Sequence, residues 1–280
     1  MLIGYQGTEG AYSALACKAF MGEAAYTTKG YATFKSLVDD MMRDVVDYIA
    51  LPVENSTSGP ITRTIDLMKY LEVSAVDEIY IKIDHALISR MPMDIEQVQH
   101  VYSHPEALEQ CHGYLNDHPT IKPHQYSDTA EAVQMVKHDG DDTMAAIAGA
   151  HAAALYNMHI ISENISDNPL NTTRFLIFRK GRIQDAGGDK TSLYIETNHS
   201  AGSLNEILNI FSTHGINLLN LTSRPIQHKP FSYGFFIDVE TGTGDVLNRA
   251  LHDVGKAGRY INMLGAYSKG AVPCYGDIQF

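Results

Sequence analysis

The chain has 280 residues, of which 44% are hydrophobic and 19% charged, as in a globular protein with a substantial core. Its formal net charge of −12 argues against a nucleic-acid-binding protein, although a few placed cations could still hold an anionic small molecule. No segment reaches the ~20 apolar residues of a membrane helix, and we expect no secretion signal. Three cysteines at unrelated spacings indicate neither a disulfide framework nor a zinc site, so we expect a cytoplasmic protein without a metal.

The first 180 residues alternate short apolar runs with helical patterns. We expect strands at 2–6, 48–53, 75–88 (one or two strands), 101–103, 145–148, 159–162 and 174–179. Helices are expected at 11–20, from 59 to 71, up to 115, from 128 towards 137 and up to 156, with proline at residue 60 suited to a first helical turn. This alternation predicts an α/β fold with parallel sheets. The long segment 75–88 and the returning strand 174–179 indicate two lobes, about 1–80 plus 163–180 and about 85–162.

A polar, glycine-rich segment at 181–189 is predicted to be a linker. The pattern then changes to a strand at 191–197, a helix at 202–214, strands at 216–223 and 233–239, a helix at 245–257 and a strand at 260–267. This βαββαβ order predicts a ferredoxin-like α+β domain over 190–268. Residues 269–280 form a tail without an interpretable pattern.

Polar clusters follow several of the expected strands, where open α/β sheets bind their ligands. The candidates are Tyr12, Ser13, Glu54, Asn55, Ser56, Thr57, His104, Gln110, Thr172, Thr173, Arg174 and Phe175. Hydroxyl groups, amides, one arginine and backbone N–H groups suit a small polyanion. Ser13 could instead be only a helix cap, and Asn55 with Ser56 could simply close a turn. Neither a metal-binding nor a nucleotide-binding motif is present.

At the same clusters the sequence resembles the prephenate dehydratase family. The motifs are Gly-Ala-Tyr-Ser at 10–13, Pro-Val-Glu-Asn-Ser-Thr at 52–57, Ser-His-Pro at 103–105 with Gln-Cys at 110–111, and Asn-Thr-Thr-Arg-Phe at 171–175. Beyond the linker, Gly-Ser-Leu at 202–204 and Ser-Arg-Pro at 223–225 resemble the effector-site motifs of an ACT regulatory domain. The resemblance implies a two-lobed, periplasmic-binding-protein-like catalytic domain (1–180) followed by an ACT domain (190–268).

The implied reaction converts prephenate to phenylpyruvate by loss of water and carbon dioxide, without a cofactor. By this resemblance Thr173 donates a proton to the departing hydroxyl, Asn55 and Gln110 orient the substrate, Ser13 assists, and Glu54 is an alternative acid. Arg174 would bind a substrate carboxylate or form a structural ion pair. The other residues implied in substrate binding are Phe175, Ser56, Thr57 and Thr172. Those implied in effector binding are Gly202, Ser203, Leu204, Ser223, Arg224 and Pro225.

Four positions depart from the family pattern. Glu106 replaces the usual glutamine, which brings a second acid to the anion site, Ala201 replaces a proline, and Ser203 replaces an alanine. Thr222 replaces a glutamate that would meet an effector's ammonium group. Phenylalanine is nevertheless the effector that the resemblance implies.

Other functions remain open at this point. Arogenate could be the substrate, because nothing in the sequence distinguishes a keto from an amino side chain. A prephenate decarboxylase, a solute-binding protein or a catalytically dead amino-acid sensor would each keep parts of the pattern. The resemblance also implies a homodimer or a dimer of dimers.

Overall fold

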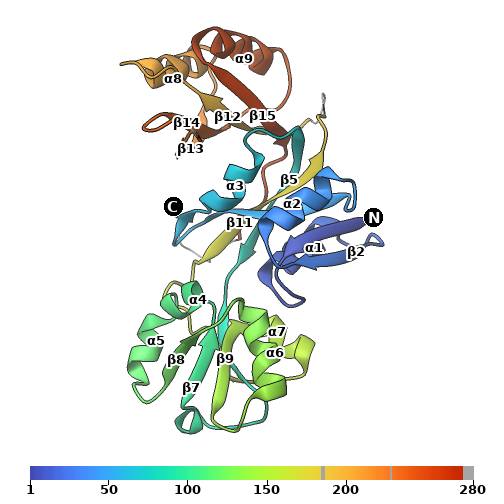
Figure 1. Cartoon of the computed structure of the whole chain (residues 1–280), viewed down its shortest axis with the longest axis vertical. Coiled ribbons are helices and arrows are strands. Elements are labelled where there is room, and N and C mark those ends of the chain that lie inside the picture. The colour runs from blue at the N-terminus through green and yellow to red at the C-terminus, as the bar shows by residue number, and fades with distance from the viewer. Residues whose placement is uncertain (184–186, 228, 274–280) are drawn as a thin grey trace.

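The computed structural model describes residues 1–183, 187–227 and 229–273, whose strands form three sheets arranged along the long axis of the molecule (Figure 1). Linker residues 184–186 and tail residues 274–280 lie outside the described residues. The strands are β1 (Leu2–Gln6), β2 (Thr27–Tyr31), β3 (Tyr48–Asn55), β4 (Gly59–Pro60), β5 (Val73–Lys82), β6 (His85–Ser89), β7 (His100–Ser103), β8 (Lys122–Gln125), β9 (Met144–Gly149), β10 (His159–Ser162), β11 (Thr172–Lys180), β12 (Lys190–Glu196), β13 (Leu218–Pro225), β14 (Tyr233–Val239) and β15 (Tyr260–Tyr267). The helices are α1 (Tyr12–Met21), α2 (Phe34–Met42), α3 (Thr62–Met68), α4 (Pro105–Glu109), α5 (His112–Asp117), α6 (Thr129–Asp139), α7 (Ala150–Tyr156), α8 (Ser203–Thr213) and α9 (Asp245–Ala257), with a 3-10 turn at Ile95–Gln97.

The first sheet has the order β2-β1-β3-β11-β5, with β4 paired to β3. Strand β3 lies at its centre, which explains its almost continuous apolar run. The second sheet has the order β10-β6-β9-β7-β8. Both sheets are mixed, and the prediction of parallel sheets was wrong: β11 runs antiparallel to β3 and β5, and β6 runs antiparallel to β9 and β10. The reason is that the chain crosses to the second sheet through β5 and β6 and later returns through β11.

The two connections between these sheets run side by side. The backbone N–H of Ile83 donates to the carbonyl of Asn171 at 2.8 Å, and that of Ile165 donates to the carbonyl of His85 at 3.0 Å. The outgoing and returning chains are therefore hydrogen-bonded to each other where they pass between the two lobes.

The third sheet, of order β13-β14-β12-β15, follows the predicted βαββαβ sequence of elements. Helices α8 and α9 cover one face of this sheet, and its other face packs against the first sheet, with which it shares a hydrophobic core. Gly265 marks the closest approach: a Cβ added there would lie 2.3 Å from the carbonyl oxygen of Ala75. The third sheet is therefore in direct contact with the first sheet where β15 approaches β5.

Several predicted elements differ from the observed ones. Gly59 and Pro60 do not begin a helix but form the short strand β4 opposite Glu54 and Asn55, and α3 starts only at Thr62. The helix expected to end at residue 115 is divided into α4 and α5. Strands β2 and β8 and helix α2 were missed; the two strands are mostly exposed and lack an apolar alternation. Among the described residues no helix is both long and apolar enough to cross a bilayer.

Candidate active site

A cavity of about 170 Å³ lies between the first and second sheets. It is lined from the first sheet's side by the start of α1, the end of β3 and the start of β11, and from the other side by β6, α4 and the start of α6. Polar residues that follow separate strands thus meet here. Of the predicted site residues, those that line the cavity are Tyr12, Ser13, Asn55, His104, Gln110, Thr173 and Phe175.

Asn55 and Thr173 form the polar centre of the cavity. They face each other in the antiparallel pair of β3 and β11, and the Asn55 Nδ2 donates to Thr173 Oγ1 at 3.0 Å. The backbone N–H groups of Thr57 and Ser58 both donate to Asn55 Oδ1 at 2.9 Å, which fixes the orientation of the amide. Within the described residues the Thr173 hydroxyl accepts this bond and has no acceptor of its own. Its hydrogen can therefore be donated to a ligand.

Gln110 and His85 form a second hydrogen-bonded pair. His85 Nε2 lies 3.0 Å from Gln110 Oε1, and the ring is 2% exposed. Burial lowers the pKa of His85, so the imidazole is neutral at pH 7. A neutral ring that donates from Nε2 to the Gln110 carbonyl leaves the Gln110 NH₂ group for a ligand.

Tyr12 supports this second pair from α1. Its ring meets those of His85 and His151 edge-on, and its hydroxyl donates to the carbonyl of Asp84 at 2.5 Å. Burial raises the pKa of Tyr12 well above its usual range, so the phenol stays neutral. Ser13 lies one residue further and is nearly buried; it does not cap α1, whose N-cap position is Ala11. The alternative reading of Ser13 as a helix cap was therefore wrong.

Five predicted site residues do not line this cavity. Residues alternate along β11, so Thr173 and Phe175 face the cavity while Arg174 points to the opposite side. Glu54, Ser56 and Thr172 border a different hollow, and the hydroxyls of Ser56 and Thr172 donate to the carbonyl of Leu170. Thr57 lies beside Asn168 and Asn171. The structure thus separates Glu54, Ser56, Thr57, Thr172 and Arg174 from the cleft.

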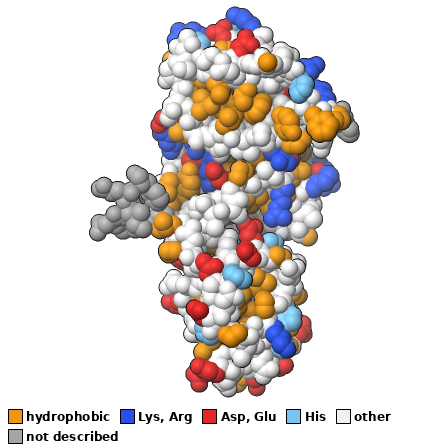
Figure 2. All heavy atoms as spheres, turned by 90° about the vertical axis from the view of Figure 1, so that its left-hand side faces the viewer, with side chains coloured by type: hydrophobic (Ala, Val, Ile, Leu, Met, Phe, Trp, Pro, Cys, Tyr) orange, Lys and Arg blue, Asp and Glu red, His pale blue; other side chains and the backbone are white. Residues whose placement is uncertain are grey.

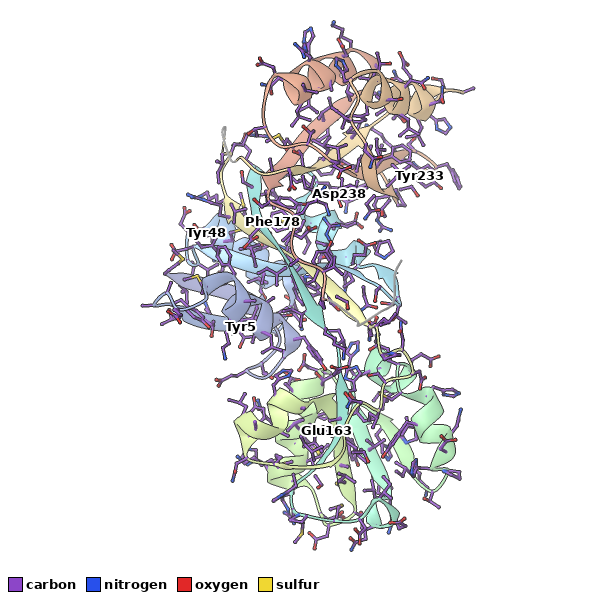
Figure 3. All side chains as sticks on the ribbon, turned by 180° about the vertical axis from the view of Figure 1, so that it is seen from behind. Tyr5, Tyr48, Glu163, Phe178, Tyr233 and Asp238 are labelled. Carbon is purple, nitrogen blue, oxygen red and sulfur yellow. The ribbon has the colours of Figure 1, made fainter. Side chains whose placement is uncertain are left out.

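Arg174 is instead the centre of a buried ion network between the first and third sheets. Its guanidinium donates to Glu78 at 2.5 Å, to Asp238 at 2.6 Å, to Glu54 at 3.4 Å and to the Tyr267 hydroxyl at 3.1 Å. Figure 3 labels Asp238 where the third sheet meets the first. We therefore withdraw the assignment of Arg174 to a substrate carboxylate, and the ion-pair alternative is the one that the structure supports.

Sequence reasoning missed further groups that line the cavity. Arg63 comes from the first turn of α3, and His85 from the start of β6, where no motif singled it out. Asp128 was missed as well, whereas Glu106, which the sequence had placed at the anion site, does line the cavity; together they bring two carboxyl groups to the side of the second sheet. Burial raises the pKa of Asp128. The described residues contain no group of three His, Cys, Asp or Glu side chains placed to hold a metal ion.

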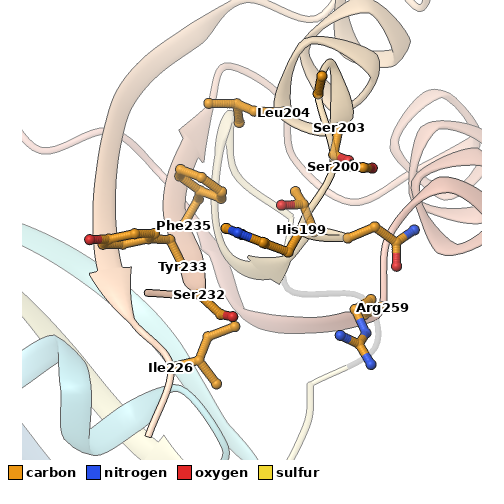
Figure 4. Close-up of a pocket in the computed structure, with 12 residues that line it drawn as sticks. His199, Ser200, Ser203, Leu204, Ile226, Ser232, Tyr233, Phe235 and Arg259 are labelled. Atoms are coloured by element: carbon orange, nitrogen blue, oxygen red, sulfur yellow. Dashed lines mark hydrogen bonds between the residues drawn. The ribbon is translucent and has the colours of Figure 1, made fainter. Parts of the chain in front are cut away.

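A second cavity, of about 330 Å³, lies in the third-sheet domain between the loop before α8 and strand β14 (Figure 4). His199 and the aromatic ring of Phe235 face its interior, with Arg259 at one side. Of the predicted effector residues, Ser203 and Leu204 line this cavity, whereas Gly202, Ser223, Arg224 and Pro225 do not. Arg224 reaches the first sheet's α3 and binds Asp66 with its Nη2 at 2.6 Å. Its predicted part in effector binding is therefore not supported within this chain.

Comparison with known proteins agrees with this architecture. Residues 3–182 match the family described as prephenate dehydratase. A bifunctional chorismate mutase/prephenate dehydratase from Neisseria gonorrhoeae is 33% identical over 273 residues, which cover 95% of this chain and 74% of the relative. A prephenate dehydratase from Arthrobacter aurescens, solved in complex with L-Phe, has a TM-score of 0.87 at 25% identity and covers 96% of this chain and 90% of that one. A protein described as GqqA, a novel type of quorum-quenching acylase, has a TM-score of 0.85 at 28% identity, with 96% of this chain and 98% of that chain covered. On the family match and the Neisseria relative, this chain belongs to the prephenate dehydratase family.

Proposed function

We propose that the protein converts prephenate to phenylpyruvate, with the cavity between the first and second sheets as its active site. The observation that carries this proposal is the Asn55–Thr173 pair, which presents a free hydroxyl hydrogen to the cavity between the two lobes. We also propose the domain division given by the sequence, with a catalytic domain at 1–180 (lobes about 1–80 plus 163–180 and about 85–162), a regulatory domain at 190–268 and a tail at 269–280. The three sheets support this division.

The reaction demands little acid–base chemistry. The C4 hydroxyl leaves the ring with one proton as water, the bond from C1 to its carboxylate breaks to release carbon dioxide, and the electron pair completes the aromatic ring. One proton is consumed, and one of the two carboxylates remains on the product. The protein must hydrogen-bond a poor leaving group and hold the ring in the reactive geometry.

We assign the donor to Thr173 and the orientation of the substrate to Asn55, Gln110 and Ser13. Because Asn55 donates to Thr173 Oγ1 at 3.0 Å, it both directs the hydroxyl hydrogen towards the cavity and makes the hydroxyl a better donor. Phe175, two residues along the same face of β11, supplies an apolar wall for the ring. Glu54 is not retained as an alternative acid, because its side chain lies with Arg174 outside this cavity.

We further propose that phenylalanine regulates the enzyme through the cavity in the third-sheet domain, an ACT domain. His199, Phe235 and Leu204 offer an apolar and aromatic lining, and Arg259 a cation for a carboxylate. The Arthrobacter relative solved with L-Phe supports an amino acid as the effector. Thr222 has no charge to meet an ammonium group, so other groups must serve it.

A homodimer or dimer of dimers through the ACT domain is part of this proposal. Strand β13 is an edge strand with Leu219 and Leu221 each 41% exposed. Figure 2 shows hydrophobic side chains gathered on the face of this domain. An unpaired apolar edge of this kind favours pairing with a second copy. Within the described part of the chain Cys17 and Cys111 are buried and form no disulfide, which suits the reducing cytoplasm that we propose as its compartment.

The test is to incubate the purified protein with prephenate at neutral pH and to measure phenylpyruvate by its absorbance in alkali and by mass spectrometry. We expect phenylpyruvate to form well above the spontaneous rate. A non-aromatic, decarboxylated product would contradict the proposal and indicate a decarboxylase. Turnover of arogenate alone would move the assignment to arogenate dehydratase.

A further inference from the structure

Most of the charged groups that line the active-site cavity are carboxyl groups, which would repel a dianionic substrate. One residue in the lining, Arg63, carries a permanent positive charge. Among the lysines and arginines of the described residues, Arg63 alone lines the cavity. The other ionisable groups from the second lobe are Glu106, Asp128, His104 and the neutral His85. Without Arg63, the cavity would offer two carboxyl groups and no permanent positive charge to a substrate with two carboxylates. The electrostatic requirement therefore falls on Arg63.

Arg63 is also free to take a ligand. Its side chain is exposed and its guanidinium carbon lies 5.2 Å from the centroid of the Phe34 ring. Within the described part of the chain it has no carboxylate partner, in contrast to Arg174, whose donors are bound to Glu78 and Asp238. An arginine stacked on an aromatic ring keeps its donors directed outwards for a planar, bidentate contact with a carboxylate.

The backbone beside Arg63 is held firmly to the strand that carries Asn55. The N–H of Ile61 donates to the carbonyl of Val53 at 2.9 Å, and the Thr64 hydroxyl donates to the carbonyl of Pro52 at 2.6 Å. Arg63 lies between these two attachment points. Its Cα is therefore fixed relative to the Asn55–Thr173 pair, although its side chain is exposed.

We propose that Arg63 binds the side-chain carboxylate of the substrate, an inference that rests on the proposed function. The ring carboxylate loses its charge as carbon dioxide leaves, so a cation bound to it would stabilise the ground state more than the transition state and slow the reaction. The side-chain carboxylate keeps its charge from substrate to product. A cation on that group strengthens binding throughout the reaction without opposing decarboxylation.

The test compares Arg63→Gln with wild type in steady-state kinetics. Loss of one charge-assisted contact should raise KM for prephenate by about 10- to 100-fold. Because the contact is equally strong in the ground state and the transition state, kcat should stay within about twofold. The inhibition constant of phenylpyruvate, which retains only the side-chain carboxylate, should rise by the same factor as KM. Arg63→Lys should recover part of the affinity.

The matched control is Arg179→Gln, another exposed arginine, whose guanidinium carbon lies 6.0 Å from the Tyr48 ring and which does not line the cavity. This control should leave KM, kcat and the inhibition constant of phenylpyruvate unchanged. An unchanged KM in Arg63→Gln would overturn the inference while leaving the proposed function intact. A raised KM with an unchanged phenylpyruvate inhibition constant would overturn the assignment to the side-chain carboxylate. A wild-type protein that neither converts prephenate nor binds it in calorimetry would overturn the proposed function and this inference together.

Discussion

The two faces of strand β11 use opposite kinds of interaction. On the cavity face, Thr173 takes part in neutral hydrogen bonds and keeps one hydrogen free. On the opposite face, Arg174 is 5% exposed and binds the carboxylates of Glu78 and Asp238 across the junction with the third sheet. Two residues that are adjacent in one sequence motif therefore serve different purposes: one is available for chemistry, and the other holds the first and third sheets together.

The two faces of β11 should also differ in how much stability a mutation removes. A buried ion network stabilises only while it is complete, because each remaining charge would be desolvated without a partner. The cavity face contains unsatisfied donors that a substrate can complete, and this costs little stability. Mutations at adjacent positions of β11 should thus separate folding from catalysis.

The largest effect is expected for Arg174→Ala. Among its side-chain partners in the described residues, Asp238 would keep only the Ser192 hydroxyl, at 2.5 Å, and its buried charge would lose its cation. Breaking such a pair should lower the free energy of unfolding by about 3–5 kcal/mol. Urea unfolding followed by tyrosine fluorescence measures this, since the chain has 16 tyrosines and no tryptophan. Arg179→Ala, an exposed position on the same strand, is the control and should change the value by less than about 0.5 kcal/mol. A loss below about 1 kcal/mol for Arg174→Ala would show that the network is not structural.

Next in size is the effect of Thr173→Ala on catalysis. Removal of the donor to the leaving hydroxyl should lower kcat by about 10²-fold or more, with the free energy of unfolding nearly unchanged. The control is Thr172→Ala, because that hydroxyl points away from the cavity and donates to the carbonyl of Leu170 at 3.1 Å. Steady-state rates of phenylpyruvate formation give kcat for both variants. If the well-folded Thr173 variant kept a near-normal kcat, Thr173 would have no part in the mechanism.

The sequence carried enough information to predict part of this comparison. The motifs predicted that Asn55, Gln110 and Thr173 would meet, because each lies at the end of a strand where a cleft between two lobes is expected. The two-residue period of a strand could also have shown that Arg174 and Thr173 face opposite sides. The identity of the partners of Arg174 could not be predicted, because Glu78 and Asp238 are distant in sequence and meet only through domain packing. The position of Arg63 at the cleft was also not predicted, because its segment was expected to belong to a helix that began at residue 59.

The smallest expected effect is the pH dependence of stability that arises because His85, which lines the cavity, is neutral. Burial lowers the pKa of His85 below the ~6.5 expected in the unfolded chain, so as pH falls through that value the unfolded state binds a proton that the folded state does not. Stability is therefore lost on acidification. Between pH 7 and pH 6, the free energy of unfolding of wild type should fall by up to about 0.7 kcal/mol more than that of His85→Gln, because residue 85 of the variant cannot take up a proton. Urea unfolding of both proteins at the two pH values measures the difference, with the exposed His112→Gln expected to follow wild type. Parallel pH dependences would mean that His85 takes up its proton in the folded protein. A charged imidazole would then lie against Gln110, and the contrast between the neutral hydrogen-bonded pairs of the cleft and the ion network around Arg174 would fail at this residue.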